Sequence, residues 1–397
     1  MTACAAVSPT YDIAVVGAGI LGLATARELL ERHPGIRLAV VEREREPAVH
    51  QSGHNSGVIH AGIYYAPGSL KARLCVDGAR RMYAFCERHG IAAERCGKLI
   101  VALDESELPG LDELERRGRA NGAEGLRRLR AEEIPELEPH ARGLAALHSP
   151  NTGIADFAAV ARALAAEVGE RGGDILLGHE VTAVRNTRGR VELEHPATAT
   201  TVARHAVFCA GGWADRLAQA AGAPADPRIV PFRGRYLRLR PHARGLVRAL
   251  IYPVPNPALP FLGVHLTKHV SGDVLLGPSA LLVPSRHSFA WPGTWRVMAK
   301  WWRTGLQEMR LAAGRRAFVA ACARYVPTLT PADVEDGWSG VRAQAVGRDG
   351  KLVDDFVFSE AAGGLHVRNA PSPGATSALS IAGVVADRAD AAFALAA

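Results

Sequence analysis

Residues 11–22 read YDIAVVGAGILG, and this stretch decides the fold. Its first six residues form an apolar, β-branched run of the kind that makes a buried parallel strand. Gly17, Gly19 and Gly22 follow in the spacing G-x-G-x-x-G and open a helical pattern that continues to about Arg32. A strand, a glycine turn and a helix in this order predict the first half of a dinucleotide-binding unit.

Each glycine has a mechanical role in that prediction. Gly17 permits the tight turn, Gly19 lets the backbone approach a pyrophosphate, and Gly22 lets the helix pack closely on the strand. We expect the phosphates at the amino end of the helix, near Ile20 and Leu21, because free N–H groups and the helix dipole attract anions there.

A second apolar strand, over residues 37–41, ends at Glu42 and Arg43. Glu42 follows Gly22 by 20 residues, where a carboxylate accepts hydrogen bonds from both ribose hydroxyls and disfavours a 2′-phosphate. The fingerprint therefore favours FAD or NAD over NADP, but it does not separate the first two.

Three later segments favour FAD. Residues 51–62 are rich in glycine and small polar residues, which let the backbone approach a planar ligand. Residues 206–212 form an apolar strand that ends in small residues, and residues 369–377 precede an apolar helical pattern. The amino end of that last helix would face the negative charge of a reduced flavin. The residues expected to contact the cofactor here are Ser52, His54, Asn55, Ser56, Gly57, Ala210, Gly211, Pro373, Gly374, Ala375, Thr376 and Ser377.

In their order, these segments resemble the FAD-dependent D-amino-acid-oxidase/glycine-oxidase superfamily. They more closely resemble the L-2-hydroxyglutarate oxidase/dehydrogenase family. The closer likeness spans residue 11 to about 385 and is carried by GHNSGVIHAGIYY (53–65), PGSLKARLC (67–75), CGKLIVA (96–102), PFRGRY (231–236), IYPVPNPALPFLGVHLT (251–267), GVRAQAV (340–346), DGKLVDDF (349–356) and NAPSPGATSA (369–378). The chain departs from the family's usual pattern at Arg235, at Gly374 and over residues 279–293.

The resemblance implies an α/β chain with a discontinuous Rossmann-type FAD-binding domain and a substrate domain built on a mixed, largely antiparallel sheet. It also implies that the peptide around Val181 contacts the adenine. The residue patterns agree: Asp156 is a good N-cap for a helix from Phe157, and residues 226–334 alternate short strands with Pro and Gly. We assign 11–90, 151–225 and 335–397 to the FAD-binding domain, 91–150 and 226–334 to the substrate domain, and 1–10 to a disordered leader.

Oxidation of a 2-hydroxy acid needs a base for the hydroxyl proton, an acceptor for the hydride and a cation for the carboxylate. Gly340-Val341-Arg342 matches the G-x-R segment that binds carboxylate in the superfamily, and a guanidinium binds a carboxylate bidentately. A histidine has the pKa nearest to working pH, so His60 is the first candidate for the base and His265 the second. The alternative interpretation of His265 is an inward-facing histidine satisfied by backbone.

A five-carbon diacid also needs a site for its distal carboxylate. The candidates, in falling order, are Arg233, Tyr252, Tyr65 and Lys71. Ordinary sheet packing is the alternative for the tyrosines, and surface solvation is the alternative for Lys71.

The function that the resemblance implies is FAD-dependent oxidation of L-2-hydroxyglutarate to 2-oxoglutarate, with oxygen or a quinone as the final electron acceptor. Three alternatives stay open. The first is an oxidase of another 2-hydroxy acid in a biosynthetic pathway, and the second is an oxidase of an amino acid or secondary amine. The third is a non-catalytic nucleotide-binding protein.

The composition limits which other classes of protein this chain can belong to. The formal net charge is +7, but only five of the 47 basic residues are lysines and the arginines are interspersed with acidic residues. We therefore predict no nucleic-acid partner. Six cysteines without a C-x-x-C pair predict neither a metal site nor a disulfide framework, and favour a cytoplasmic location. No run of 18 apolar residues predicts a membrane-spanning helix.

One segment bears on the electron acceptor. Over residues 295–316 the pattern predicts a helix with basic residues around an apolar stripe made of Trp295, Met298, Trp302, Leu306 and Met309. We interpret the stripe as the packed face of a substrate-domain helix, which is the usual origin of such a pattern. The alternative is peripheral contact with the inner face of an anionic membrane, from which a quinone takes the electrons.

Overall fold

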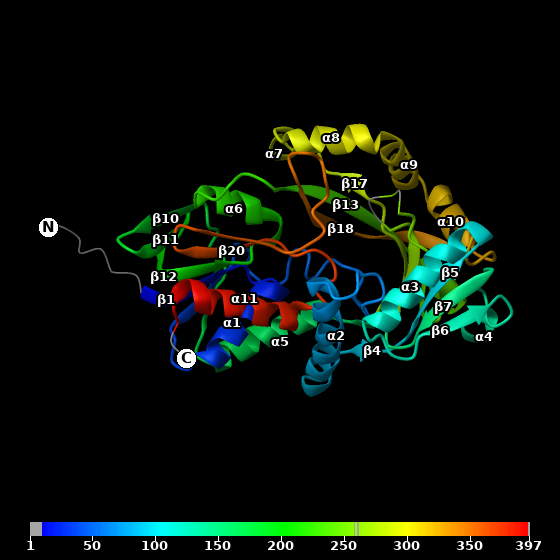
Figure 1. Ribbon diagram of the computed structural model, residues 1–397, viewed down its shortest axis with the longest axis horizontal. Coiled ribbons are helices and arrows are strands. Elements are labelled where there is room, and N and C mark those ends of the chain that lie inside the picture. The colour runs from blue at the N-terminus through cyan, green and yellow to red at the C-terminus, as the bar shows by residue number, and fades with distance from the viewer. Residues whose placement is uncertain (1–9, 258, 260–261, 396–397) are drawn as a thin grey trace.

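The computed structural model describes residues 10–257, 259 and 262–395 (Figure 1). The disordered leader predicted over residues 1–10 falls largely on residues 1–9, which lie outside the described residues. Thr10 differs from that prediction, because it begins the first strand.

The first sheet has eight strands, and its centre is parallel. The strands are β1 (Thr10–Val16), β2 (Leu38–Val41), β9 (Asp174–Leu176), β10 (Ala183–Thr187), β11 (Arg190–Glu194), β12 (Thr201–Phe208), β19 (Val357–Ala361) and β20 (Gly364–Asn369). β1 lies between β2 and β12, β9 pairs with the far side of β2, and β20 pairs in parallel with β12. The β10–β11 hairpin and β19 add antiparallel pairs at the margins.

The side chains of β1 point alternately to the two faces of the sheet, so the core around this sheet has two layers. Ile13 and Val15 face three helices, α1 (Ile20–Arg32), α5 (Phe157–Glu170) and α11 (Ala378–Phe393), which Figure 1 shows together on one face. Ala14 and Val16 face the β10–β11 hairpin and α6 (Ala214–Ala220) on the other. Both faces of the central strands are buried, which is why their sequences are continuously apolar.

Two local predictions from the sequence are confirmed. The helix after the glycine turn runs from Ile20 to Arg32. Asp156 caps α5, because its carboxylate accepts a hydrogen bond from the N–H of Ala159 at 2.9 Å.

The second sheet has nine strands and is mostly antiparallel. Its strands are β5 (Lys98–Ala102), β6 (Arg127–Arg130), β7 (Ala145–Ser149), β13 (Arg228–Leu239), β14 (Leu250–Pro253), β15 (His265–Lys268), β16 (Val274–Gly277), β17 (Leu281–Leu282) and β18 (Val334–Val346). β5 and β14 are its parallel pair, and β13 pairs with β18 along almost its full length. A third, small sheet joins β3 (Val58–Ile59), β4 (Ala93–Glu94) and β8 (Gly153–Ala155).

The remaining helices pack around these sheets. They are α2 (Leu70–Arg88), α3 (Leu108–Ala120), α4 (Ile134–Leu137), α7 (Arg286–Phe289), α8 (Pro292–Lys300), α9 (Trp302–Ala313) and α10 (Arg315–Ala323), with short 3₁₀ turns at Glu105–Glu107, Gly211–Trp213, Pro241–Leu246 and Pro331–Asp333. The expected alternation of short strands over residues 226–334 is therefore wrong after β17, where residues 286–323 are helical. β18 pairs in the second sheet, although the boundary placed at residue 335 groups it with the first. The domain limits themselves stay a prediction.

The expected helix over residues 295–316 is divided into α8, α9 and the start of α10. Trp301 and Gly314 interrupt it, because their backbones leave the helical region. The interpretation of its apolar stripe as a packed face is also wrong: Trp295, Met298 and Trp302 are exposed, as are the other two members. On α8 the buried residues are instead Gly293, Thr294 and Val297. None of the described helices is long and apolar enough to cross a membrane.

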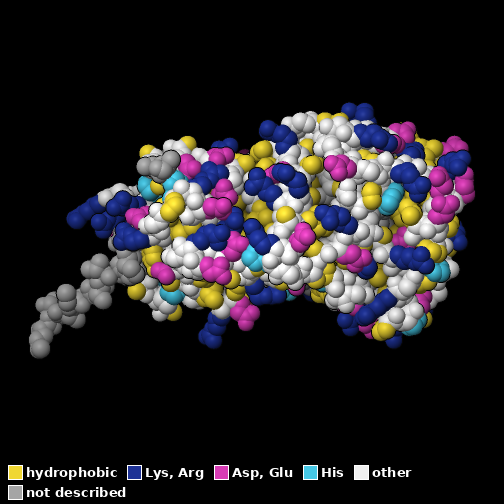
Figure 2. Space-filling view, turned by 90° about the horizontal axis from the view of Figure 1, so that it is seen from below, with side chains coloured by type: hydrophobic (Ala, Val, Ile, Leu, Met, Phe, Trp, Pro, Cys, Tyr) yellow, Lys and Arg dark blue, Asp and Glu magenta, His cyan; other side chains and the backbone are white. Residues whose placement is uncertain are grey.

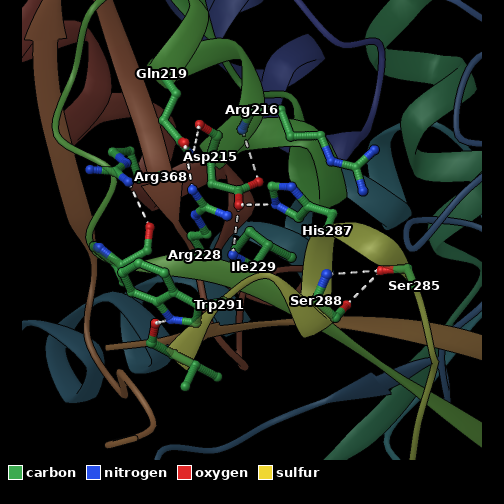
Figure 3. A network of polar contacts seen from close by, with 12 residues as sticks. Asp215, Arg216, Gln219, Arg228, Ile229, Ser285, His287, Ser288, Trp291 and Arg368 are labelled. Carbon is green, nitrogen blue, oxygen red and sulfur yellow. Dashed lines mark hydrogen bonds and ion pairs between the residues drawn. The ribbon is translucent and has the colours of Figure 1, made fainter. Parts of the chain in front are cut away.

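A buried carboxylate connects α7, the short helix that precedes α8, to the rest of the molecule. Asp215 on α6 is 1% exposed and accepts hydrogen bonds from the N–H of Ile229 at 3.0 Å and from Nε2 of His287 at 2.7 Å (Figure 3). Arg368 on β20 donates to the carbonyls of Asp226 and Pro227 just beside it. These contacts connect α6, β13, β20 and α7, so α7 has a fixed position beside the first sheet.

Candidate functional site

A single cavity of about 770 Å³ connects the two sheets. One end is lined by the glycine turn after β1 and by the end of β2, and the other by side chains of β13, β14, β15 and β18. The carboxyl ends of the parallel strands open into it, which is where open α/β sheets bind their ligands.

The glycine turn is shaped by close approaches of backbone. Gly17 has φ +109°, and a Cβ there would lie 2.6 Å from the carbonyl oxygen of Cys209, which directly follows the neighbouring strand β12. A Cβ on Gly22 would lie 1.9 Å from the carbonyl oxygen of Gly17. Only glycine fits these two places, so α1 begins close to the sheet with its amino end at the cavity. Ser52 accepts a hydrogen bond from the N–H of Ile20 at 2.9 Å.

Glu42 lies at the carboxyl end of β2 and lines the same end of the cavity. Its carboxylate accepts hydrogen bonds from the N–H groups of Ala18 at 2.7 Å and Glu44 at 3.0 Å. Arg43 places its guanidinium 4.5 Å from the ring centre of Trp213, another lining residue. An acid and an aromatic ring that line the same cavity fit the ribose and adenine of a dinucleotide.

The loop before α11 supplies free donors. Among the described residues, none accepts a hydrogen bond from the N–H of Gly374, Ala375 or Thr376. α11 begins directly after them at Ala378, so its dipole adds positive potential to the same place. The hydroxyl of Thr376 accepts from the N–H of His60 and donates to the carbonyl of Val58, both at 3.1 Å, so the loop is fixed to β3. This arrangement fits the electron-rich edge of a flavin.

Most of the predicted cofactor residues line the cavity. They are Gly17, Gly19, Ile20, Leu21, Glu42, Arg43, Ser52, His54, Asn55, Ser56, Val181, Ala210, Gly211, Pro373, Gly374, Ala375 and Thr376. Three do not line it. Gly22 packs against Gly17 as described above, Gly57 lines a smaller pocket on the other side of its loop, and Ser377 is fully buried as the N-cap residue of α11.

Arg342 lies on β18 at the opposite end of the cavity, and its side chain is open to the cavity space. A Cβ on Gly340 would lie 2.4 Å from the carbonyl oxygen of His54, so only glycine lets β18 approach the 51–62 loop this closely. Gly340 thereby sets the position of Arg342, the third residue of the G-x-R segment. Burial lowers the pKa of Arg342, and Tyr236 and Tyr252 act in the opposite direction. The guanidinium keeps its charge.

His60 lies at the junction of the two ends of the cavity. Its Nδ1 is buried and has no hydrogen-bond partner among the described residues. Burial, with Lys98 and His265 nearby, holds the pKa of His60 well below its usual value of 6.5. The imidazole is therefore neutral at physiological pH. The residue lines the cavity, although Nδ1 itself is enclosed by the protein.

His265 faces the same chamber from β15. Its ring stacks on Tyr252 with 3.9 Å between centres, and its Nδ1 lies 3.3 Å from the hydroxyl of Thr267. Burial, followed by Lys98 and Arg342, lowers the pKa of His265 to about 3. It is thus more constrained than His60, although both are neutral.

Lys98 on β5 is a residue that the sequence did not single out. It is 1% exposed, and no ion pair joins its ammonium to a carboxylate among the described residues. The ammonium lies 4.1 Å from the ring centre of Tyr252 and 5.1 Å from that of Tyr64. Because His265 also stacks on Tyr252, van der Waals contact places the two groups on opposite faces of that ring. Burial lowers the pKa of Lys98 from 10.5 to about 7.

Three of the four candidates for the distal carboxylate line the cavity, namely Tyr252, Tyr65 and Lys71. Lys71 is already paired with Asp354 at 2.7 Å. Arg233 is not brought to the site: it is exposed and donates to the hydroxyl of Ser339. The reason is strand alternation, since its neighbours Phe232 and Gly234 on β13 face the cavity.

Arg235 points away from the cavity as well. Its guanidinium donates to the carbonyl of Ala312 and pairs with Asp336, so this departure from the family's pattern ties β13 to α9. Among the lining residues that sequence reasoning missed are Tyr64 and Tyr236. Burial raises the pKa of both phenols, so they remain neutral donors. The quoted blocks around 64 and 236 contained them, but nothing local distinguished them from packing tyrosines.

Comparison with known proteins gives matches over nearly the whole chain. Residues 12–388 match the family model described as FAD dependent oxidoreductase. The chain is 46% identical over 420 residues to the mitochondrial L-2-hydroxyglutarate dehydrogenase of Nematostella vectensis, with 98% of this chain and 92% of that protein covered. It is 43% identical over 408 residues to the mitochondrial enzyme of the same name from Bos taurus, with coverages of 95% and 88%.

Among solved structures, the fold is similar to that of dithionite-reduced L-alpha-glycerophosphate oxidase from Mycoplasma pneumoniae with FAD bound. The TM-score is 0.78 at 25% sequence identity, and the match covers 96% of this chain and 94% of that one. The likeness therefore includes both sheets.

Proposed function

We propose that this chain oxidises L-2-hydroxyglutarate to 2-oxoglutarate. The chain belongs to the family of FAD-dependent oxidoreductases. The observation that carries the proposal is the single cavity. Its nucleotide end, with Gly17 and Glu42, fits the AMP half of FAD. The other end brings an arginine and neutral histidines together in one chamber.

Bound FAD supplies the hydride acceptor for this reaction at flavin N5. Arg342 binds the C1 carboxylate of the substrate, since a guanidinium that lines the cavity offers two parallel N–H donors to a carboxylate. Together with contacts to the substrate hydroxyl and to the distal carboxylate, this contact presents one face of C2, which supports selection of a single enantiomer.

His60 accepts the hydroxyl proton as C2 is oxidised. It is neutral and lines the cavity. His265 has a more constrained ring, held by Tyr252 and Thr267, and we assign it the orientation of the substrate hydroxyl. Thr376 holds the backbone of His60 and so positions the base relative to the loop before α11.

The distal carboxylate of the five-carbon diacid is assigned to the wall formed by Tyr65 and Lys71. Among the four candidates, Lys71 is the one cation that lines the cavity. Its ammonium lies 5.1 Å from the ring centre of Tyr65. Its partner Asp354 is highly exposed, so a substrate carboxylate can replace that contact without leaving a buried charge.

The electrons pass to oxygen or to a quinone, and the proposed location is the cytoplasm, in peripheral contact with the inner face of the membrane. The five cysteines in the described part of the chain are free thiols, which supports a reducing compartment. The two animal relatives are named mitochondrial.

Steady-state assays with an artificial acceptor test the substrate assignment. The panel contains L- and D-2-hydroxyglutarate, L-lactate, glycine, sarcosine and D-amino acids, and glutarate serves as a competitor. We expect turnover of L-2-hydroxyglutarate, little of L-lactate, and competitive inhibition by glutarate. Faster turnover of glycine or sarcosine would instead support the amine-oxidase alternative, since an amine substrate needs no distal cation.

A further inference from the structure

One charged side chain of this protein is buried beside the reaction chamber without a counter-ion. On the face of the molecule shown in Figure 2, basic and acidic side chains are interspersed at the surface, where water and opposite charges compensate them. Lys98 differs, because it is 1% exposed and no carboxylate pairs with its ammonium in the described part of the chain. A charge in such a position is costly unless a ligand compensates it.

The register of the second sheet places Lys98 behind the wall of the chamber. β5 pairs in parallel with β14, with Lys98 opposite Leu250, two residues before Tyr252. Alternation then puts the side chains of Lys98 and Tyr252 on the same face of the sheet. Tyr252 and Tyr64 line the cavity, and the ammonium lies 4.1 Å and 5.1 Å from their ring centres. Lys98 is not itself a lining residue, so its charge acts on the cavity from behind these rings.

The polar groups that surround Lys98 carry no negative charge near neutral pH. The thiols of Cys75 and Cys96 are close enough to act on the ammonium. Burial raises the pKa of Cys75 to about 12 and that of Cys96 to about 11, so both thiols are protonated. Burial also raises the pKa of the Tyr64 and Tyr252 phenols, which are therefore neutral.

The groups on the chamber side do not compensate Lys98 either. His60 and His265 are neutral, since burial and then Lys98 lower the pKa of each. Arg342 also acts on His265 and has the same sign of charge as Lys98. The other lysine and arginines of the cavity wall have acidic residues beside them: Arg43 has Glu44, Lys71 has Asp354 and Arg368 has Asp215.

A dianion is the ligand that matches this arrangement. Both carboxyl groups of a five-carbon diacid are ionised at neutral pH. Under the proposed function, the C1 carboxylate pairs with Arg342 and the second carboxylate lies at the wall that Tyr65 and Lys71 form. Because the charge of Lys71 is shared with Asp354, Lys98 is the further positive charge that the second carboxylate meets.

We propose that Lys98 is the counter-charge of the second carboxylate: it attracts a dianionic ligand from behind Tyr252 and Tyr64 without touching it, and it takes up a proton when the diacid binds. Lys98 is thus a positioning residue rather than a catalytic one, since it does not line the cavity. The inference rests on the proposed function for the identity of the diacid.

Proton uptake follows from the linkage between the two charges. Burial lowers the pKa of Lys98 from 10.5 to about 7, so part of the free protein carries a neutral amine at physiological pH. A negative charge across an aromatic ring favours the ammonium and raises this pKa by roughly one unit. The protonated protein then binds the diacid about tenfold more tightly. Binding is therefore tightest below the pKa of free Lys98 and weakens as pH rises through that of the complex.

Calorimetric titration of the FAD-loaded protein with glutarate tests the proposal, in buffers that differ in their enthalpy of ionisation. At pH 7.5 the wild type should take up about half a proton for each glutarate bound. The Kd for glutarate should rise by up to about tenfold between pH 6.5 and pH 9. The monoamide of glutaric acid has the same length but a neutral distal end. It should take up less of a proton, and its Kd should depend less on pH.

Lys98→Met should bind glutarate about tenfold more weakly than the wild type at pH 6.5, without proton uptake and with a Kd that does not change up to pH 9. A role in packing alone would instead weaken binding equally at every pH. Lys268→Met is the matched control, because Lys268 is another lysine of the second sheet but has its ammonium paired with Glu94 at 2.6 Å. Its Kd and its proton uptake should equal those of the wild type.

Two results overturn the proposal. One is the absence of net proton uptake when glutarate is added to the wild type at pH 7.5, and this result does not depend on the folding of any variant. The other is uptake of the same size in Lys98→Met, which would assign the proton to another group. Nothing is oxidised in these titrations. Uptake without turnover of L-2-hydroxyglutarate would therefore contradict the proposed function alone, and turnover without uptake would contradict this inference alone.

Discussion

The ammonium of Lys98 lies 4.1 Å from the ring centre of Tyr252, on the face opposite to the one that His265 covers. A buried cation without a carboxylate is unfavourable, and the aromatic ring compensates for only part of the lost hydration. Lys98 acts electrostatically on both histidines of the chamber and lowers the pKa of each. We therefore expect it to keep the candidate base neutral.

Replacing Lys98 with methionine should shift the pH dependence of kcat/KM. Removal of a neighbouring positive charge raises the pKa of His60 and of His265, and the base is then protonated up to a higher pH. The acidic limb of the profile should move to higher pH by roughly one unit. Lys351→Met, at an exposed lysine paired with Asp349, is the control and should leave the limb in place. An unchanged limb in Lys98→Met would show that Lys98 does not act on the base.

The same substitution should stabilise the protein at low pH. The pKa of Lys98 falls from 10.5 to about 7 on folding. The unfolded chain thus binds more protons between these values, and wild-type stability rises with pH across that window. Below pH 7 the penalty is complete, so Lys98→Met should gain a few kcal/mol there, at about 1.4 kcal/mol per pKa unit. Denaturant titrations at pH 6.5 and at pH 10 measure it; an equal gain at both would exclude the titration of Lys98 as its cause.

Arg342 and Arg233 form a matched pair for testing the carboxylate site. They lie on adjacent strands, and of the two only Arg342 lines the cavity. Arg342→Ala should lower kcat/KM by about 10²-fold or more, because the carboxylate loses two charge-assisted hydrogen bonds and its orientation. Arg233→Ala should have little effect on kcat/KM. If the Arg233 variant were the impaired one, the assignment of the carboxylate would have to be reversed.

His60→Ala should lose most of kcat and retain FAD. A positioned general base contributes typically 10²–10⁴-fold, and the loss is expected in that range. His242→Ala is the control, because His242 is an exposed histidine paired with Asp333. Flavin content of both variants is read from absorbance. Undiminished turnover in His60→Ala would transfer the role of the base to His265.

The nucleotide end of the site was predictable from the sequence to a large extent. Gly17 and Gly22 are glycines because a Cβ would meet backbone at 2.6 Å and 1.9 Å, and such steric requirements leave a local signature. Arg342 was found through its G-x-R segment, and Asp156 through its place before an apolar helix. These are requirements of one short segment, which a sequence displays directly.

The substrate end depends on relationships between distant segments. The sequence alone does not show that Arg233 faces away from the cavity. That follows from β13, whose residues Phe232 and Gly234 line the cavity. Lys98 lies in an apolar strand, and nothing local shows that its ammonium lies over Tyr252. The Trp295–Met309 stripe has the same spacing whether it is packed or exposed, so only the tertiary structure decides between them.

The most direct test of the central claim is anaerobic stopped-flow reduction of the purified protein by L-2-hydroxyglutarate. The account predicts that the absorption band of the oxidised flavin bleaches in the wild type. Bleaching should be slower when C2 of the substrate carries deuterium, and slower again in Arg342→Ala. A flavin that stays oxidised in the presence of L-2-hydroxyglutarate, or that is reduced as fast in Arg342→Ala as in the wild type, would contradict it.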